Sequence, residues 1–273
     1  MPLELLTSPK LYCDKDFSDA ELHLFAEGEV GVFNKKCPGK DSPNEDSAAI
    51  IPFDKNSGIL VVADGAGGMP SGARASEATV NALQKSLKEA TKKNLPLRTA
   101  ILDGIENANK EIVSWGIGSA TTVAVVEFTK NTIRTYHVGD SQIMVLGQKG
   151  KLKTLTLPHS PVGYAVESGI MGDQEALHHE ERHLVSNLLG DASMRIEVGS
   201  QMELAAKDTV VLASDGLFDN MKIDEIIEHC RKGSLLSICE SIASICKTRM
   251  EVPAEGRPSK PDDLAFLVYR LRE

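Results

Sequence analysis

The stretch GILVVADGAGG, residues 58–68, decides the fold class of this chain. Its first six residues are apolar, and a second apolar run, SAAIIPF at residues 47–53, precedes it. The turn-forming residues 54–57 separate the two runs, which predicts a β-hairpin. The later run ends at Asp64 and Gly65, and the small residues after them leave the backbone much conformational freedom. We therefore expect a buried strand that delivers a carboxylate to a loop.

Helical and strand-like patterns follow each other along the rest of the chain. Apolar residues recur at helical spacing over residues 75–90 and 101–112, with a break at Asn94-Leu95-Pro96, which predicts two antiparallel helices. Two further helical patterns occupy about 223–249, and residues 158–195 are less regular. Strand-like runs lie at 20–33, as one or two edge strands, and at 120–128, 132–138, 142–146, 151–156, 208–214 and 264–271.

Hairpin-linked strands combined with paired helices favour an α+β fold over a parallel βαβ sheet. The predicted architecture is two packed antiparallel β-sheets flanked by helix pairs, an α-β-β-α four-layer sandwich.

The composition narrows the range of possible partners and cellular locations. The 273 residues carry a formal net charge of -9, which argues against a nucleic-acid or anionic-membrane partner. The five cysteines form no CxxC pair and are odd in number, so we expect no disulfide scaffold and a cytoplasmic location. No segment has the pattern of a signal peptide or the apolar length of a membrane span.

Acidic residues stand at the ends of several expected strands. Asp64, Asp140 and Asp215 follow strands, whereas Glu45-Asp46 and Asp262-Asp263 precede strands. An unpaired carboxylate in a core costs several kcal/mol, but carboxylates that converge on one rim are tolerated when cations neutralise them. Oxygen ligands select Mg²⁺ or Mn²⁺ over Zn²⁺. Any one of these aspartates alone is more commonly a turn residue than a ligand.

Eight short segments set the aspartates in a larger pattern: PNED (43–46), VVADGAGG (61–68), SATT (119–122), HVGDS (137–141), LTLPHS (155–160), LLGD (188–191), ASDGLFD (213–219) and PDDLA (261–265). In these segments and their order the chain resembles the type 2C (PPM) metal-dependent Ser/Thr protein phosphatase family, from about residue 40 to residue 270. The resemblance implies a single phosphatase domain over residues 1–273, with a variable flap at about 158–187.

The resemblance also implies roles for individual residues. Asp64 would bridge two cations, the Gly65 carbonyl would bind one of them, and Asp215 and Asp262 would complete the shell. Glu45 and Asp46 would hold metal-bound waters. Asp140 and Asp219 would bind a third cation, and Asp219 lies one helical turn after Asp215.

With two or three Mn²⁺ or Mg²⁺ ions per chain, a metal-activated water would hydrolyse phosphoserine or phosphothreonine, so Asp64, Asp215 and Asp262 are the catalytic candidates.

Some positions depart from the family pattern. Asp41 stands where many members have a phosphate-binding arginine, and its neighbour Lys40 is the candidate replacement, with a solvated loop lysine as the alternative. Gln142, Ala66 and Asp263 also replace commoner residues. His179 and His183, within the flap, are four residues apart, and we interpret them as exposed helix residues rather than ligands.

Two functions therefore remain open: an active phosphatase with a phosphorylated protein as substrate, expected to be a monomer, and a catalytically silent binding or regulatory module. The complete set of aspartates favours the first, and the departures on the substrate side leave room for the second.

Overall fold

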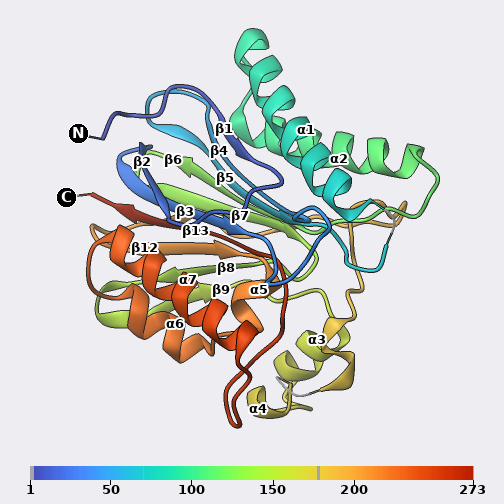
Figure 1. The fold of residues 1–273 in the computed structure, drawn as a ribbon. Coiled ribbons are helices and arrows are strands. Elements are labelled where there is room, and N and C mark those ends of the chain that lie inside the picture. Colours follow the sequence, from blue (N-terminus) through green and yellow to red (C-terminus); the bar gives the residue numbers. More distant parts are fainter. Residues whose placement is uncertain (1–2, 70, 177–178, 273) are drawn as a thin grey trace.

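The computed structural model describes residues 3–69, 71–176 and 179–272. Within these residues the chain forms two antiparallel β-sheets that pack face to face, with a helix pair on the outside of each sheet (Figure 1). The predicted α+β four-layer sandwich is confirmed.

The first sheet contains, in the described part of the chain, seven strands in the order β1-β4-β5-β6-β7-β10, and β11 also pairs with β7. Every strand pair in it is antiparallel. Its strands are β1 (Lys10–Tyr12), β4 (Asp46–Pro52), β5 (Ser57–Asp64), β6 (Val123–Thr129), β7 (Thr132–Val138), β10 (Glu197–Val198) and β11 (Met202–Glu203).

The second sheet has six described strands in the order β2-β3-β13-β12-β8-β9, also antiparallel throughout. Its strands are β2 (Glu21–Phe25), β3 (Gly28–Lys35), β8 (Gln142–Leu146), β9 (Leu152–Leu155), β12 (Thr209–Ala213) and β13 (Leu264–Leu271).

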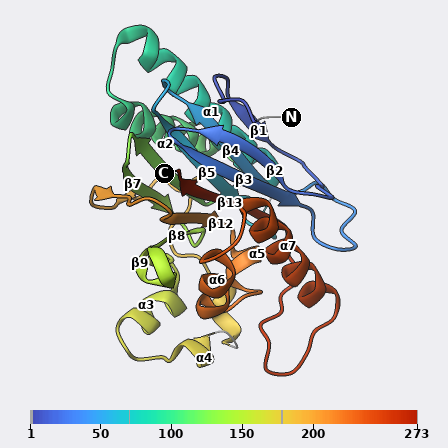
Figure 2. The same ribbon diagram turned by 90° about the vertical axis from the view of Figure 1, so that its left-hand side faces the viewer.

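The helix pair α1 (Gly72–Lys93) and α2 (Leu97–Ser114) covers the first sheet, and the pair α6 (Ile223–Cys230) and α7 (Leu235–Glu251) covers the second (Figure 1). The short helices α3 (Pro161–Glu167) and α4 (Asp173–Ala176) project away from the sandwich in both views (Figures 1 and 2). The remaining helical segments are α5 (Asp215–Phe218) and the 3₁₀ turns η1 (Gln148–Gly150) and η2 (Glu180–His183).

Side chains along a strand point alternately to its two faces, and both faces of the inner strands are covered by other parts of the fold. Apolar residues are therefore favoured at successive positions of these strands. On β5, Ile59 and Val61 pack in the layer below α1 and α2, whereas Leu60 and Val62 pack between the two sheets. A third apolar layer lies between the second sheet and α6 and α7. Both faces of each sheet are covered, and the acidic residues of the site lie at strand ends or just beyond them.

The structure departs from the predicted pattern in several places, and the three-residue strand β1 is one element that was not predicted. The region 20–33 forms two strands, but only β2 is an edge strand, since β3 lies between β2 and β13. The two-residue strands β10 and β11 were not predicted, because two residues are too few to show an alternating pattern.

No helix in the described ranges combines the length and the apolar character needed to cross a bilayer.

Candidate active site

Asp46 and Asp64 lie at the ends of two neighbouring strands of the first sheet. Asp46 opens β4 and is paired across the ladder with Asp64, which closes β5. Asp46 is only 1% exposed, and its Oδ2 accepts a hydrogen bond of 2.6 Å from the hydroxyl of Ser214. Ser214 follows β12 of the second sheet, so this bond connects the carboxylates of the first sheet to the start of α5.

Asp215 and Asp262 are brought together by close packing of α5 on the chain that enters β13. A Cβ atom added to Gly216 would lie 2.0 Å from the backbone oxygen of Asp263, so only glycine fits there. Ser214 donates its backbone N–H to the carbonyl of Ala265 at 3.0 Å. The contact fixes the two ligand candidates side by side, although 46 residues separate them in the sequence.

The two candidates for a third cation lie at the same edge. Asp219 caps the C-terminus of α5, and its N–H donates to the carbonyl of Asp215 at 2.7 Å. Asp140 follows Gly139, whose φ of +100° favours glycine. Burial first, and then the charge of Asp215, raise the pKa of Asp140 to about 7.

Burial, together with the charges of neighbouring carboxylates, raises the pKa of four further carboxyls. Burial is the largest cause for Asp46, Asp64, Asp219 and Asp262, and neighbouring carboxylates add to it, so the pKa of each lies above its ordinary value. For Asp262 the pKa is about 6. The cluster therefore needs positive charge from a bound cation or a basic side chain to stay ionised.

Lys260 supplies such a charge from within the chain. Its Nζ lies 3.1 Å from Asp219 Oδ2 and 3.0 Å from Asp262 Oδ2, and it also contacts Asp215. Burial acts to lower the pKa of Lys260, but the three carboxylates outweigh it and raise that pKa. The sequence reasoning missed this residue, and its only signal was a position two residues before Asp262.

The phosphate-binding candidate, Lys40, is also paired with carboxylates. Its Nζ lies 2.8 Å from Glu45 Oε2 and 2.6 Å from Asp263 Oδ2. Asp263 also accepts the backbone N–H groups of Cys37 and Glu45, each at 2.7 Å. The carboxylate at position 263, where asparagine is commoner in the family, is thus matched by the lysine at position 40.

The backbone around Asp64 and Gly65 is held by neighbouring strands. The hydroxyl of Thr121 donates to the Asp64 carbonyl at 2.7 Å, and the Asp64 N–H donates to the hydroxyl of Thr122 at 3.1 Å. The Gly65 N–H donates to the carbonyl of Glu45 at 3.0 Å. Glu45, proposed from the sequence to hold a metal-bound water, is therefore connected to Gly65 through the backbone.

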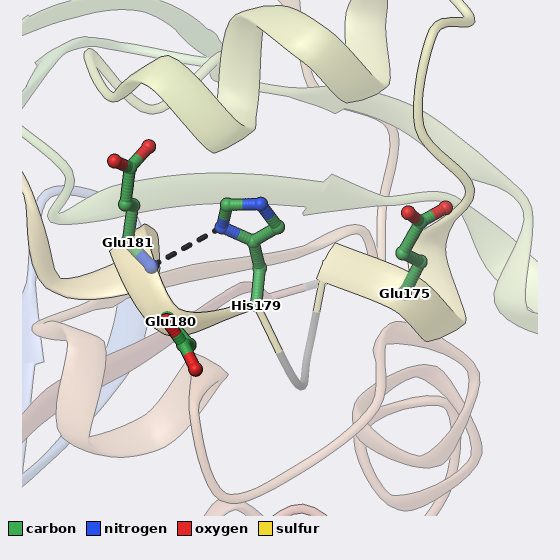
Figure 3. A pocket seen from close by; sticks show the side chains of 4 residues that line it. All are labelled: Glu175, His179, Glu180 and Glu181. Atoms are coloured by element: carbon green, nitrogen blue, oxygen red, sulfur yellow. Dashed lines mark hydrogen bonds between the residues drawn. The ribbon is translucent and has the colours of Figure 1, made fainter.

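The histidine-rich part of the flap forms no ligand set among the described residues. His179 lines an open pocket with Glu175, Glu180 and Glu181, and its Nδ1 accepts the Glu181 N–H at 3.1 Å (Figure 3). His179 therefore caps η2 instead of lying in a longer helix, as the sequence had suggested. His178 and the side chain of His183 lie outside the described part of the chain.

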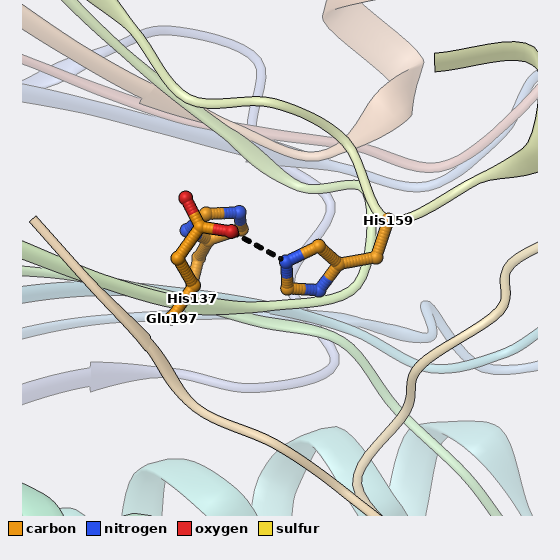
Figure 4. A group of neighbouring side chains, drawn as sticks. All are labelled: His137, His159 and Glu197. Atoms are coloured by element: carbon orange, nitrogen blue, oxygen red, sulfur yellow. Dashed lines mark hydrogen bonds and ion pairs between the residues drawn. The ribbon is translucent and has the colours of Figure 1, made fainter. Parts of the chain in front are cut away.

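A second histidine group supports the turn that carries Asp140. The rings of His137 and His159 stack with centroids 4.4 Å apart, and His159 Nε2 lies 3.2 Å from Glu197 Oε2 (Figure 4). His159 Nδ1 accepts hydrogen bonds from the Gly139 N–H at 3.1 Å and the Asn187 amide at 2.9 Å. Its proton must then lie on Nε2, so this nitrogen donates to Glu197 and has no lone pair for a metal.

The residues at the edge fit hard divalent cations. All the side-chain donors are carboxylate oxygens, which Mg²⁺ and Mn²⁺ prefer. Burial and the charges of neighbouring carboxylates both raise the pKa of Asp46, Asp64 and Asp140, and divalent cations would offset both effects. The ammonium of Lys260 among three of these carboxylates shows that the cluster attracts positive charge.

Known proteins share this sequence pattern and fold. The family model described as Protein phosphatase 2C matches residues 35–245. The serine/threonine phosphatase stp of Listeria monocytogenes is 30% identical over 203 residues, which cover 71% of this chain and 80% of that protein.

Two solved structures have the same fold. The S. agalactiae serine/threonine phosphatase is similar with a TM-score of 0.76 and 23% identity, covering 90% of this chain and 100% of that one. The catalytic domain of the phosphatase PstP, in complex with two manganese ions, has a TM-score of 0.69 and 21% identity, covering 89% and 98%. With the family match extending over most of its length, this chain belongs to the protein phosphatase 2C family.

Proposed function

We propose that this chain removes phosphate from phosphoserine and phosphothreonine in proteins, using divalent cations held by the aspartate cluster. As a family member it is a metal-dependent protein-serine/threonine phosphatase. The observation that carries the assignment of the site is the convergence of Asp64, Asp215 and Asp262 from three distant parts of the chain. A silent binding module would need no such concentration of repelling carboxylates.

We assign some of these residues to cation binding and others to the orientation of water. Asp64, the Gly65 carbonyl, Asp215 and Asp262 would hold two cations. These cations would supply an acidified water for attack on phosphorus and positive charge for the phosphoryl oxygens. The Ser214 hydroxyl fixes one oxygen of Asp46, which leaves the other to orient a water. Lys40 fixes Glu45 in the same way.

The number and kind of cations are part of the proposal. The manganese complex of PstP supports Mn²⁺ as a ligand of this fold, and we propose Mn²⁺ or Mg²⁺, two or three per chain. Asp140 and Asp219 would hold the third. Lys40 remains the candidate for contact with the substrate phosphate, which would have to draw its ammonium away from Glu45 and Asp263.

We further propose that the enzyme is a cytoplasmic monomer built as a single domain over residues 1–273. The five cysteines are free thiols, which supports a reducing compartment.

The test is hydrolysis of p-nitrophenyl phosphate and of a phosphothreonine peptide with Mn²⁺, with Mg²⁺ and with EDTA. Both substrates should be hydrolysed with either cation and should stay intact with the chelator. A calorimetric Mn²⁺ titration of the same sample counts the cations. Bound Mn²⁺ without hydrolysis of either substrate would favour the silent alternative, and full activity in EDTA would contradict the metal assignment.

A further inference from the structure

The ammonium of Lys260 lies where a divalent cation would be expected. It contacts Asp215, Asp219 and Asp262, three of the residues proposed as cation ligands. Each of these contacts uses the Oδ2 atom of the aspartate, so the three oxygens point toward a common centre. An oxygen that bonds an ammonium has fewer lone pairs left for a metal ion.

The position of Lys260 is built into the fold. The side-chain amide of Asn220, which is fully buried, accepts the backbone N–H of Lys260 at 3.0 Å and donates to its carbonyl at 2.8 Å. The same amide donates to the carbonyl of Gly216 at 2.9 Å, which ties the lysine backbone to α5. With the backbone fixed on both sides, the lysine side chain starts beside the cluster and reaches it without rearrangement of the loop.

We infer that Lys260 is a built-in competitor of the metal: its ammonium neutralises Asp215, Asp219 and Asp262 in the metal-free enzyme and is displaced when a divalent cation binds there. This inference rests on the proposed function, because it takes these aspartates as cation ligands. We call these three aspartates the outer end of the cluster, and Asp46 and Asp64 its inner end. The competition weakens metal binding at the outer end. It also stabilises the metal-free fold, because the ammonium neutralises the three charges when no cation is bound.

The side chain has room to leave. It is 22% exposed, so its flexible four-carbon stem borders solvent and can swing out while the Asn220 clamp keeps the backbone in place. Asp46 and Asp64, at the inner end, are not among the carboxylates that Lys260 contacts in the described structure. A cation bound there would therefore meet less competition than one bound through Asp262.

The first test follows the lysine itself in the wild-type enzyme. The protein is treated with an amine-acetylating reagent, with and without saturating Mn²⁺, and acetylation of Lys260 is measured by peptide mass spectrometry. Displacement into solvent frees the amine from its three carboxylate partners and should raise its labelling several-fold. Lys110, on the exposed surface of α2, is the internal control and should not change. Unchanged labelling of Lys260 at saturating Mn²⁺ would overturn the inference.

The second test compares Mn²⁺ titrations of the wild type, Lys260→Gln, Lys260→Arg and Lys110→Gln. Lys260→Gln should bind the weakest wild-type cation about tenfold more tightly, within the usual range for coupling between two ligands, and should unfold at a lower temperature in EDTA. Lys110→Gln makes the same change in net charge and should match the wild type.

Lys260→Arg keeps the charge and should retain the competition. If Lys260→Gln folds only in the presence of Mn²⁺, this supports the stabilising role of the ammonium. Wild-type protein that binds no Mn²⁺ would contradict the proposed function and the competition together. Wild-type binding that Lys260→Gln leaves unchanged, with an unchanged unfolding temperature in EDTA, would contradict the competition alone.

Discussion

The two ends of the aspartate cluster both bring carboxylates close together, but different groups of the chain contact those carboxylates. At the inner end, Asp46 and Asp64 face each other across a strand pair, and a neutral hydroxyl, that of Ser214, bonds to Asp46. At the outer end, Asp215 and Asp262 share the ammonium of Lys260. The inner end thus presents repelling carboxyls, whereas the outer end is partly neutralised by the chain.

This contrast implies that the cations bound within one site differ in affinity. A cation at the inner end relieves repulsion between buried groups, so its binding is opposed mainly by protons. A cation at the outer end must also break three ion pairs. We therefore expect the inner end to fill first and the outer end to set the metal concentration that activity requires.

The largest effect on the hydrolysis rate should come from removing one carboxylate charge at either end of the aspartate cluster. Asp64→Asn and Asp215→Asn nearly preserve shape, but each should lower the rate of p-nitrophenyl phosphate hydrolysis by about a hundredfold or more, on the order of 3 kcal/mol in the barrier. If the ends differ as proposed, Asp64→Asn should also abolish the tightest step of a calorimetric Mn²⁺ titration, whereas Asp215→Asn should spare it.

Asp103→Asn is the matched control, because Asp103 is exposed on α2 and should leave the rate and the titration unchanged. Near-normal rates in both active-site variants would show that the ligand assignment is wrong. Loss of the tightest step in Asp215→Asn alone would reverse the order of filling.

Much of the secondary structure around this site could be predicted from the local sequence. The observed bounds of β7, β8 and β13 equal the predicted ranges 132–138, 142–146 and 264–271, because turn residues border these runs in the sequence. The gathering of Asp64, Asp215 and Asp262 at one edge could be expected because each lies at a strand end beside a turn.

The partners of the lysines could not be predicted in that way. Lys260 reaches the cluster because Asn220, 40 residues earlier, binds its backbone. Lys40 meets Asp263 across 223 residues, and only the packing of the two segments creates that pair. Such contacts depend on tertiary structure, which periodicity and turn signals do not encode.

An intermediate effect should come from Lys40. Lys260 contacts the proposed ligands directly, whereas Lys40 contacts Glu45 and Asp263 beside them. Lys40→Ala leaves the carboxylate of Asp263, only 3% exposed, without its ammonium partner. The loss should lower the free energy of unfolding by about 2 kcal/mol, as expected when a buried charge loses its partner. Urea denaturation in EDTA measures it.

The double variant Lys40→Ala/Asp263→Asn is the control, since a neutral amide needs no cation and should recover most of the lost stability. Its KM for p-nitrophenyl phosphate decides the second role of Lys40. A KM several times that of Asp263→Asn would show that Lys40 also contacts the substrate phosphate. No loss of stability in Lys40→Ala would mean that the ion pair contributes little.

The smallest effect concerns the support behind the outer end. Arg249 donates to both carboxylate oxygens of Glu225, at 2.8 and 2.6 Å, and to the backbone carbonyl of Asn220 at 2.6 Å. Asn220 in turn holds Lys260. The hydrogen bonds from Arg249, opposed by partial burial, lower the pKa of Glu225 to about 2.

The sign of the pH dependence follows from this lowered pKa. An unfolded glutamate titrates near pH ~4.3, so the stabilisation by Glu225 is complete above about pH 5 and is lost as the pH falls toward 2. Since the Glu225 side chain is 34% exposed, solvent screening limits the contribution to about 1 kcal/mol. Glu225→Gln should therefore be less stable than the wild type at pH 7 by about that amount, and the difference should shrink below about pH 4.

Urea denaturation in EDTA at pH 7, 5, 4 and 3 measures the difference without a contribution from bound metal. Glu251→Gln is the control, because the described structure gives Glu251 a long, exposed pair with Lys247 at 3.9 Å. This variant should show almost no difference at any of these pH values. A gap between wild type and Glu225→Gln that stays constant from pH 7 to pH 3 would mean that the glutamate acts through packing and not through its charge. In that case the charge of Glu225 would not be needed to hold Asn220 and Lys260, and the hydrogen bond from Arg249 to the Asn220 carbonyl would act without the ion pair.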